Sequence, residues 1–313
     1  MIILLSAADI LQVWAEAGTI RKGETPLAGR KYGLDLGTMN IRIFQGGHGL
    51  VVYEKNMIAI QRKKEVAAIG NDAFEMYERT PASIVISNPV RDGVIADINN
   101  MNKVAETLLK KCGCTTGFMR NNSFYLAVPS DVTEVEKRAY FDLIAHSAYN
   151  THNIFVVEKP LAAALGENVD VKSKKGMMIV DMGAGTTEIT VITMGGIVVS
   201  KLLKVGGNTI NASICQLVKE RHHLVIGDKT AEYLKLELGH AIPGQGRGKT
   251  VFGRDVITGL PSKAEVSDHL VFDSMKNYLF QVVRTIRNIM ETIPPELSGD
   301  IIENGIYLQA ERH

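Results

Sequence analysis

Cysteine and tryptophan are scarce in this chain of 313 residues, which has three cysteines and one tryptophan. Three cysteines are too few, and odd in number, for a disulfide framework, so a reducing compartment is the expected environment. Cys112 and Cys114 have no second pair of ligands at metal-binding spacing, which argues against a zinc site. We therefore expect a core held together by apolar packing.

The chain also has no excess of positive or negative charge, since it contains 35 Lys and Arg residues and 34 Asp and Glu residues. This balance argues against a nucleic-acid partner, which requires clustered positive charge. No stretch reaches the roughly 18 consecutive apolar residues of a membrane-spanning helix. Residues 1–20 lack the basic start of a signal peptide, and Asp9 interrupts their apolar stretch, so residues 1–30 are interpreted as an N-terminal extension and linker.

The length is typical of two domains, and apolar patterning predicts an α/β fold. Strands are predicted where short apolar segments are bounded by glycine, proline or polar residues, at 32–36, 41–44, 50–53, 124–128 and 154–157. Helices are predicted from helical apolar spacing and start signals, at 132–147, 161–165, 231–238 and 272–290. The first of these helices has a capping pattern, with Thr133 followed by Glu136.

One order of elements occurs twice in the chain, in residues 32–53 and again in residues 177–203. In each, an apolar strand carries an aspartate near its end and is followed by a glycine turn, a strand, a second glycine turn and a third strand. This repetition predicts two related halves. Facing halves would place the turns that follow Asp35 and Asp181 on opposite walls of one cleft.

The two turns have the composition of a phosphate clamp. Glycine lets the backbone approach a phosphate closely, and successive N–H groups then form a concavity that binds anions. The glycines of the clamps are Gly37, Gly183 and Gly185, and Thr38 and Thr186 add hydroxyl donors. Asp35 and Asp181 are predicted to reach a magnesium ion through water, because magnesium gives up its hydration reluctantly. The pattern favours a nucleoside triphosphate with its metal over two ordinary hairpin turns.

These turns and several other stretches resemble the MreB family of bacterial actins, within the superfamily of actin and heat-shock chaperone ATPases. The similarity runs from about Tyr32 to Leu308 and is carried by residues 32–38, 91–97, 128–130, 132–138, 161–164, 179–188, 258–261, 294–296 and 300–302. The resemblance implies an actin-like (duplicated ribonuclease H-like) fold, with two lobes of two subdomains around a nucleotide cleft. The first lobe is expected at 31–173, with a small subdomain at about 59–90, and the second at 174–313, with a small subdomain at about 210–270.

The resemblance also implies ATP and magnesium as cofactors, and self-assembly into homopolymer filaments. In the family these filaments lie at the inner face of the cytoplasmic membrane, where they organise the cell-wall synthesis machinery and determine cell shape. A cytoplasmic, peripheral membrane location follows. The sequence alone leaves open two alternatives: an enzyme of the same fold, such as a sugar kinase or a chaperone-type ATPase, and a non-polymerising regulatory fragment.

Family positions extend the candidate site beyond the glycines. By position, phosphate contacts fall on Met39, Asn40, Ile41, Gly183, Ala184 and Gly185, with Ala184 in place of a family glycine. Glu232 and Lys235 fall on the nucleoside-binding helix, although such a pair is also common on a solvated helix face. Gly207 begins a stretch in which relatives carry acidic residues, whereas this chain has the neutral Asn208, Thr209 and Asn211.

The position of the family's catalytic glutamate carries a lysine. The family keeps glutamate immediately before the proline that matches Pro160, and this chain has Lys159 there, with Glu158 one residue earlier. A carboxylate accepts a proton from water, and an ammonium does not. Glu158 is a weak substitute, because neighbouring side chains point in different directions. We expect at most a slow ATPase, with Lys159 pairing with the terminal phosphate, unless another group orients the water.

Two further segments carry expectations. After Leu308 the family continues into a third glycine-rich loop and a closing helix, whereas this chain gives five more residues, so a truncated C-terminus with weaker nucleotide affinity is expected. Phe118 and Met119 lie where MreB relatives carry a membrane-inserting loop, and the alternative is a loop packed on the core. Residues 244–250 nearly spell a P-loop, but Pro243 replaces its first glycine, and we interpret them as a flexible loop.

Overall fold

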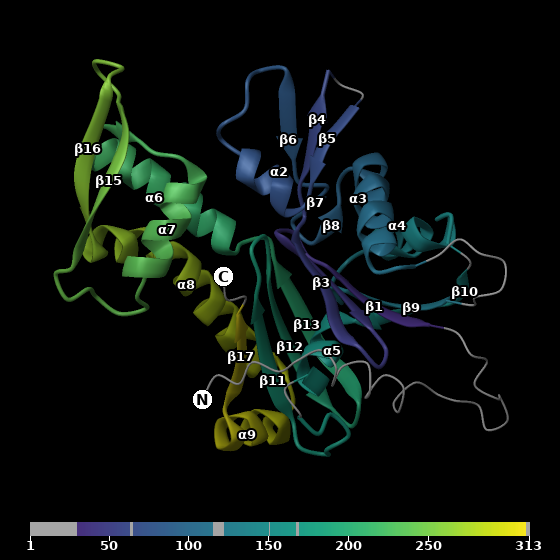
Figure 1. The fold of residues 1–313 in the computed structure, drawn as a ribbon. Coiled ribbons are helices and arrows are strands. Elements are labelled where there is room, and N and C mark those ends of the chain that lie inside the picture. The colour runs from purple at the N-terminus through teal and green to yellow at the C-terminus, as the bar shows by residue number, and fades with distance from the viewer. Residues whose placement is uncertain (1–29, 63–64, 115–121, 150, 167–168, 311–313) are drawn as a thin grey trace, which may run out of the picture.

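The computed structural model describes residues 30–62, 65–114, 122–149, 151–166 and 169–310, and all statements below concern these ranges. It has two large sheets and two smaller three-stranded sheets (Figure 1). We call the part built from β1 to β10 the first lobe and the part built from β11 to β17 the second lobe. Within the described ranges, no helix is both long enough and apolar enough to cross a membrane.

The large sheet of the first lobe has the order β10-β9-β1-β2-β3. Its strands are β1 (Lys31–Leu36), β2 (Asn40–Gln45), β3 (Gly49–Lys55), β9 (Asn122–Val128) and β10 (Thr151–Glu158). Alternate residues of β1 (Tyr32, Leu34 and Leu36) pack in one apolar core with α3 (Ile98–Lys111) and α4 (Glu134–Ala145). Because side chains alternate across a strand, Asp35 is directed to the opposite face of the sheet.

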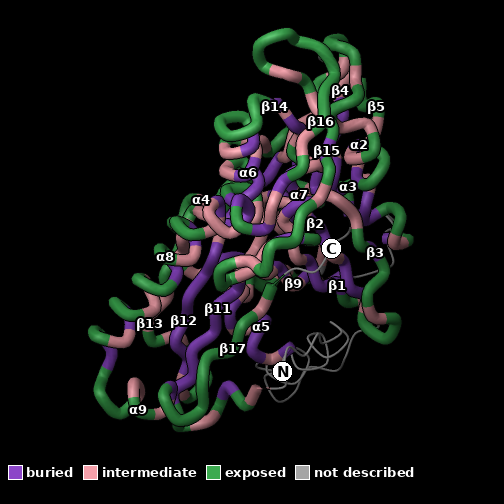
Figure 2. The backbone as a smooth tube through the Cα atoms, turned by 90° about the vertical axis from the view of Figure 1, so that its left-hand side faces the viewer, coloured by how far each residue is buried: buried purple, intermediate pink, exposed green. Residues whose placement is uncertain are grey.

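The large sheet of the second lobe repeats this plan in the order β13-β12-β11-β17. Its strands are β11 (Met177–Met182), β12 (Thr187–Thr193), β13 (Gly196–Leu203) and β17 (Ile306–Ala310). β1 pairs antiparallel with β2 and parallel with β9, and β11 likewise pairs antiparallel with β12 and parallel with β17. The predicted duplication is therefore present in strand order and direction. β11 and β12 are buried along nearly their whole length (Figure 2).

Helix α5 (Lys159–Gly166) lies between the two large sheets and contacts β9 and β10 of the first and β11 and β12 of the second (Figure 1). Ala164 on this helix packs in one core with Met177 and Ile179 of β11. Asp181 is an even number of residues from Met177 and Ile179, so its side chain lies on the same face of β11 as theirs. The first residue of α5 is Lys159, and the fold therefore delivers that side chain to the aspartates of both halves.

Each lobe carries a smaller sheet. In the first lobe the order is β5-β4-β6, from β4 (Ile58–Gln61), β5 (Glu65–Ile69) and β6 (Ile84–Ser87), with α2 (Asn71–Met76) beside it. The strand pair β7 (Val90–Arg91) and β8 (Val94–Ile95) follows. In the second lobe the order is β14-β15-β16, from β14 (Leu224–Val225), β15 (Gly248–Asp255) and β16 (Pro261–Ser267), next to α6 (Gly207–His222), α7 (Asp228–Leu238) and α8 (Asp268–Thr292).

Several local predictions agree with these elements. Thr133 caps α4, since its side chain accepts from the Glu136 amide while Glu136 accepts from the Thr133 amide. Helix α8 ends before Pro294, as proline removes a helical donor, and α9 (Pro295–Asn304) then starts with proline in its first turn. Helices α2, α3 and α9 were not anticipated: α2 and α9 are short, with 6 and 10 residues, whereas the apolar periodicity of the 14-residue α3 was present in the sequence and was overlooked.

Candidate functional site

The two glycine turns touch across the interface of the lobes. A Cβ atom added to Gly185 would lie 2.8 Å from Thr38 Oγ1, so glycine is required where the second turn meets the first. Asp35 and Asp181 both line one small cavity of about 30 Å³. Its other lining residues include Gly37, Thr38, Lys159, Thr186 and Glu188. The structure thus brings both predicted clamps and both aspartates into a single crevice.

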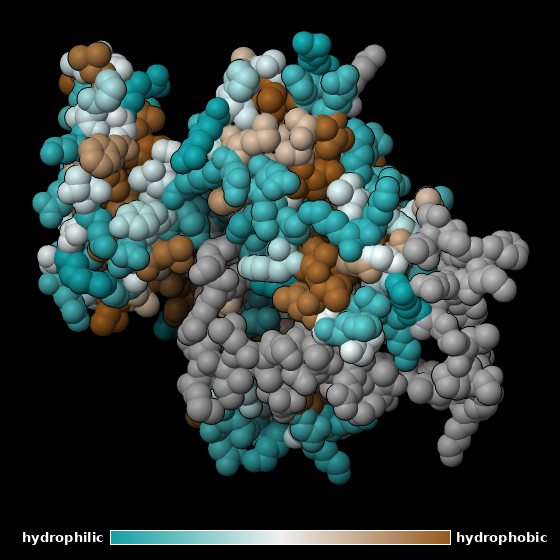
Figure 3. Space-filling model, viewed as in Figure 1, coloured by the Kyte–Doolittle hydropathy of each residue, from teal (hydrophilic) through white to brown (hydrophobic). Residues whose placement is uncertain are grey.

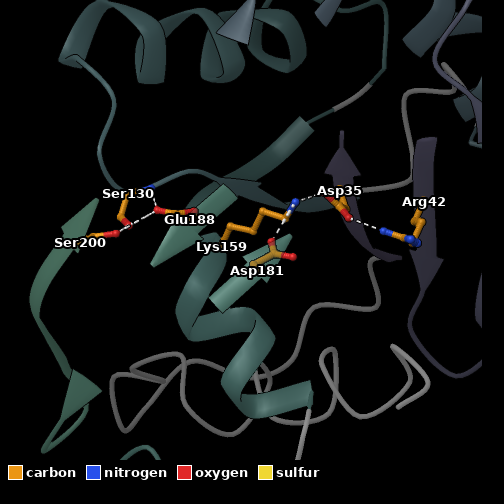
Figure 4. Close-up of polar contacts among 7 residues, drawn as sticks. All are labelled: Asp35, Arg42, Ser130, Lys159, Asp181, Glu188 and Ser200. Carbon is orange, nitrogen blue, oxygen red and sulfur yellow. Dashed lines mark hydrogen bonds and ion pairs between the residues drawn. The ribbon is translucent and has the colours of Figure 1, made fainter. Parts of the chain in front are cut away.

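Lys159 lies between the two aspartates (Figure 4). Its Nζ atom is 3.3 Å from Asp181 Oδ2 and 3.9 Å from Asp35 Oδ1. All three side chains are mostly shielded from solvent, with exposed fractions of 25%, 8% and 19% for Lys159, Asp181 and Asp35. A lysine in the first turn of a helix is disfavoured by the helix dipole, and the two carboxylates offset that cost. Lys159 therefore neutralises the acidic pair instead of pointing into solvent.

The second oxygen of Asp35 is also engaged. Arg42 Nη1 donates a hydrogen bond of 3.0 Å to Asp35 Oδ2, and the Arg42 guanidinium lies 5.4 Å from the centre of the Tyr53 ring. Burial opposes the charged form of Asp35, but the Lys159 ammonium and the Arg42 guanidinium outweigh it and hold the pKa of this carboxyl below its usual value. Asp35 is therefore ionised at neutral pH.

Glu188 is a site residue that the sequence analysis did not select. It is 3% exposed on β12 and accepts hydrogen bonds from the Ser130 amide at 2.8 Å, from the Ser130 hydroxyl, and from the Ser200 hydroxyl at 3.2 Å (Figure 4). Burial raises the pKa of Glu188, although the Ser130 hydrogen bonds work against the rise. The signal that could have found it is an acidic residue inside a strand that otherwise contains only Ile, Val and Thr.

A larger cavity of about 770 Å³ opens beside the small one, and Thr38 lines both. Its volume is within the range of small-molecule sites, and both lobes contribute to it. From the first lobe its walls include Thr38, Met39, Phe74, Tyr77 and Asn88, and from the second Gly185, Asn208, Thr209, Asn211, Asp228, Lys229, Glu232 and Tyr233. Both lobes contribute polar side chains and the first contributes most of the apolar ones, so the lining has contacts to offer to the base and to the sugar of a nucleoside.

Two asparagines fix the first turn. The Asn56 side chain donates to the Gly37 carbonyl at 2.8 Å, and the Asn88 side chain donates to the Thr38 carbonyl at 3.3 Å. The Met39 carbonyl accepts from the Asn56 amide at 2.8 Å. Three successive carbonyls are thereby satisfied within the protein, which holds the turn in one conformation. Neither asparagine follows from the turn's own sequence.

The second turn is supported by the start of α6. The Gly207 and Asn208 amides donate to the carbonyls of Gly183 and Ala184, at 3.1 and 2.8 Å. A Cβ atom on Gly206 would lie 2.5 Å from the Gly183 oxygen, so only glycine fits there. These contacts join Gly183, Ala184 and Gly207 into one structural unit, although 23 positions separate Ala184 from Gly207 along the chain.

Glu232 and Lys235 form a part-buried pair rather than a solvated helix face. Glu232 Oε2 accepts from Lys235 Nζ at 2.6 Å and from Asn211 Nδ2 at 2.7 Å. Lys235 also donates to the Gly207 carbonyl at 3.4 Å. Glu232 lines the larger cavity, while Lys235 ties α7 to the first residue of α6. The pair thus links the wall of the larger cavity to the second glycine turn.

Five other predicted residues are not among the described residues that line the two cavities. Asn40 and Ile41 are 1% and 0% exposed as whole residues, Ile41 belongs to the apolar core, and neither lines the two cavities. Glu158 ends β10 opposite Val128, and it is not among the described residues that line the two cavities. Phe118 and Met119 lie outside the described residues.

A set of contacts between the end of helix α2 and the start of helix α7, which the sequence analysis missed, joins the two lobes beside the larger cavity. We call Tyr77, Glu78, Asp228 and Lys229 the latch. Tyr77 donates to Asp228 Oδ2 at 2.8 Å, and Glu78 accepts from the Asp228 and Lys229 amides at the start of α7. The Lys229 ammonium donates to the Phe74 carbonyl and lies 4.5 Å from the centre of the Phe74 ring. Glu78 thereby serves as the N-terminal cap that Gly227 lacks.

The acidic pair does not fit a hydrated divalent cation. Magnesium takes six oxygen ligands at about 2.1 Å and keeps several waters. Here an ammonium lies between Asp35 and Asp181, and Arg42 occupies the other oxygen of Asp35. The cavity of about 30 Å³ beside them has room for about one or two waters. Across the described residues, no group of three or more His, Cys, Asp or Glu side chains is placed to hold a metal ion.

Two duplicated sheets, a shared helix and a cavity between paired glycine turns define an actin-like protein. Comparison with protein families and structures agrees: the family described as MreB/Mbl protein matches residues 29–310. The chain is 36% identical over 284 residues to the cell shape-determining protein MreB of Escherichia coli, covering 88% of this chain and 80% of that protein. It is 34% identical over 281 residues to the cell shape-determining protein Mbl of Bacillus cereus, covering 89% and 84%. The chain belongs to the MreB/Mbl family.

Solved structures share the fold. MreB5 of Spiroplasma citri bound to AMPPNP superposes with a TM-score of 0.86 at 31% identity, covering 91% of this chain and 85% of that one. A MamK double helical filament superposes with a TM-score of 0.75 at 20% identity, covering 90% and 86%, and at that identity it supports the fold alone. The predicted actin-like fold and the predicted family are confirmed.

Proposed function

We propose that this chain binds ATP between its lobes and assembles into filaments that organise cell-wall synthesis and help to determine cell shape at the inner face of the membrane. The observation that carries the proposal is the meeting of the Thr38 turn and the Gly185 turn beside a cavity of about 770 Å³. The AMPPNP-bound relative and the cell shape-determining relatives support it.

ATP is held in this proposal by both lobes. The two glycine turns receive the phosphates, the Thr38 and Thr186 hydroxyls donate to them, and Glu232 and Asn211 lie on the nucleoside wall. ATP supplies a cleavable phosphoanhydride, but Lys159 stands where the family places its catalytic carboxylate. An ammonium does not accept a proton from water, so the nucleotide acts as a bound switch that is hydrolysed slowly.

Self-association has a candidate surface on the second lobe. The hairpin of β15 and β16 projects from it and carries apolar side chains, and Figure 3 shows apolar atoms at the surface of this subdomain. Ile257 is 81% exposed, Phe252 74% and Leu260 64%. Exposed apolar patches of this kind mark interaction sites. We propose this hairpin as part of the filament contact.

Pelleting with ATP tests assembly. The wild-type chain should sediment with ATP, and Ile257→Asp should reduce the pelleted fraction by at least about half, because a buried charge costs several kcal/mol. Val135→Asp is the matched control, since Val135 is 80% exposed on α4, away from that hairpin. Tight ATP binding without sedimentation would instead favour a kinase or a regulatory fragment, and absence of ATP binding would overturn the proposal.

The membrane contact is proposed for Phe118 and Met119, beside the basic Arg120. Apolar side chains next to a basic one suit an anionic bilayer surface. Replacement of Phe118 and Met119 by serine should abolish flotation with anionic liposomes. Cys112→Ser, nearby in sequence on the C-cap of α3, should leave flotation unchanged. Flotation that survives the double replacement would exclude this loop as the anchor.

A further inference from the structure

We propose that the Lys159 ammonium takes the place of a divalent cation in the phosphate site, so that this chain binds its nucleotide without a protein-bound metal. The inference rests on the proposed nucleotide site and concerns how that site balances charge. Its geometric basis is the single ammonium that bridges Asp35 and Asp181, one aspartate from each half of the duplication.

The four charged side chains that contact one another balance without a metal, while Glu188, which lines the same cavity, is held by hydrogen bonds from Ser130 and Ser200. Asp35 and Asp181 contribute two negative charges, and Lys159 and Arg42 contribute two positive ones, so the formal charge of the four side chains is zero. Two carboxylates alone would repel a polyphosphate unless a divalent cation neutralised them. Lys159 and Arg42 supply that neutralisation from the chain itself.

The size of the cavity also argues against a divalent cation bound between the two aspartates. The cavity beside Lys159 measures about 30 Å³, which accommodates about one or two waters. A magnesium ion with its retained waters requires more room and oxygen ligands at about 2.1 Å. A cation could contact Asp35 and Asp181 together only if Lys159 moved away. The two carboxylates would then lose the positive charge that they hold in the structure.

Lys159 also faces the ligand position. It lines the small cavity together with Gly37, Thr38 and Thr186, the residues of the two phosphate clamps. Lysine binds phosphate as a point charge and needs no fixed geometry for it. One ammonium therefore neutralises the aspartates and attracts the terminal phosphate, which a catalytic carboxylate at this position would repel.

Titration of ATP into the purified chain, in excess EDTA and then in excess Mg²⁺, tests the inference by calorimetry. The dissociation constant of the wild-type chain should differ by less than about threefold between the two conditions, well under the tenfold that corresponds to 1.4 kcal/mol. In Lys159→Gln, which removes the charge, affinity in EDTA should fall at least about tenfold, and Mg²⁺ should restore most of the loss. Lys159→Arg should remain insensitive to the metal.

Lys235→Gln is the matched control. Lys235 is also paired with a carboxylate at the cleft, 2.6 Å from Glu232, but its partner is neither of the two aspartates. Its loss should weaken ATP binding equally in EDTA and in Mg²⁺. Wild-type binding that is lost in EDTA and recovered in Mg²⁺ would overturn the inference and leave the nucleotide site intact. Absence of binding in both conditions would instead overturn the proposed function, and the wild-type comparison decides this even if a variant misfolds.

Discussion

The Tyr77 hydroxyl donates a hydrogen bond of 2.8 Å to Asp228 Oδ2 and so joins the end of helix α2 in the first lobe to helix α7 of the second. Burial and the adjacent carboxylate raise the pKa of Tyr77, which keeps the phenol protonated as a donor. Tyr77 and Asp228 both line the larger cavity. The latch therefore joins the two lobes at the wall of the larger cavity.

Tyr77→Phe should speed nucleotide release. The variant removes one hydrogen bond worth about 1 kcal/mol, which corresponds to about a fivefold faster dissociation. Stopped-flow displacement of a fluorescent ATP analogue measures it. Tyr307→Phe removes a hydroxyl from β17, outside the latch, and should leave the rate unchanged. Equal rates for wild type and Tyr77→Phe would show that the latch does not gate release.

Lys159→Glu should raise phosphate release from ATP. The change restores a carboxylate at the position where the family places its catalytic glutamate, and a positioned base contributes about 10²–10⁴-fold. We expect at least about a tenfold rise in a steady-state phosphate assay with Mg²⁺. Glu158→Gln, one residue earlier at the end of β10, should have no such effect. A wild-type rate equal to that of an ordinary bacterial actin would contradict the idea that Lys159 suppresses hydrolysis.

Asp35 should make the fold sensitive to acid. Its pKa in the folded chain is below the usual value because Lys159 and Arg42 outweigh burial. Such a group contributes stability above its unfolded pKa of about 4 and loses that contribution as the pH falls toward the folded value. Urea denaturation should show Asp35→Asn to be less stable than wild type by about 1–2 kcal/mol at neutral pH, a figure reduced for partial exposure.

The same series of pH values supplies the control. The stability difference between wild type and Asp35→Asn should shrink as the pH falls through 4, since protonation removes the ion pairs from the wild type as well. Asp142→Asn removes an exposed partner of Arg138 on α4 and should show little difference at any pH. A difference for Asp35→Asn that is constant with pH would exclude ionisation as its origin.

Gly206→Ala should weaken nucleotide binding at least about tenfold, which corresponds to about 1.4 kcal/mol. The added Cβ would lie 2.5 Å from the Gly183 oxygen and 2.7 Å from the Ala184 oxygen, so the second glycine turn must move. Gly299→Ala is the control, because nothing lies within 4 Å of a Cβ there. In helix α9 that change should raise stability by about 0.5–1 kcal/mol. Unchanged ATP affinity in Gly206→Ala would show that the turn tolerates displacement.

Local pattern was enough to predict the repeated halves and several of their elements. The order of strand, turn and strand occurs twice, each time within one continuous stretch of the chain. Thr133 and Glu136 indicate the start of α4, because the capping contacts between them lie within one helical turn. Asp35 and Asp181 were predicted for the same reason: each occupies the same place in its copy of the repeat.

Residues that come into contact only through the tertiary structure could not be predicted from this local pattern. Glu188 and Ser130 are 58 positions apart and Tyr77 and Asp228 are 151 apart, so no local spacing relates them. Lys159 was singled out as a departure from the family, but its partners were not. They follow from α5, which lies between the two sheets and brings its first residue to both aspartates.

The sequence by itself therefore determined the two-fold plan and the glycine turns, because these depend on short-range backbone preference and on the pattern of apolar residues, and it indicated the family through the resemblance of its motifs. Tertiary structure alone decided the charge balance of the site and the latch, because both depend on packing that brings side chains from opposite lobes within hydrogen-bonding or ion-pairing distance.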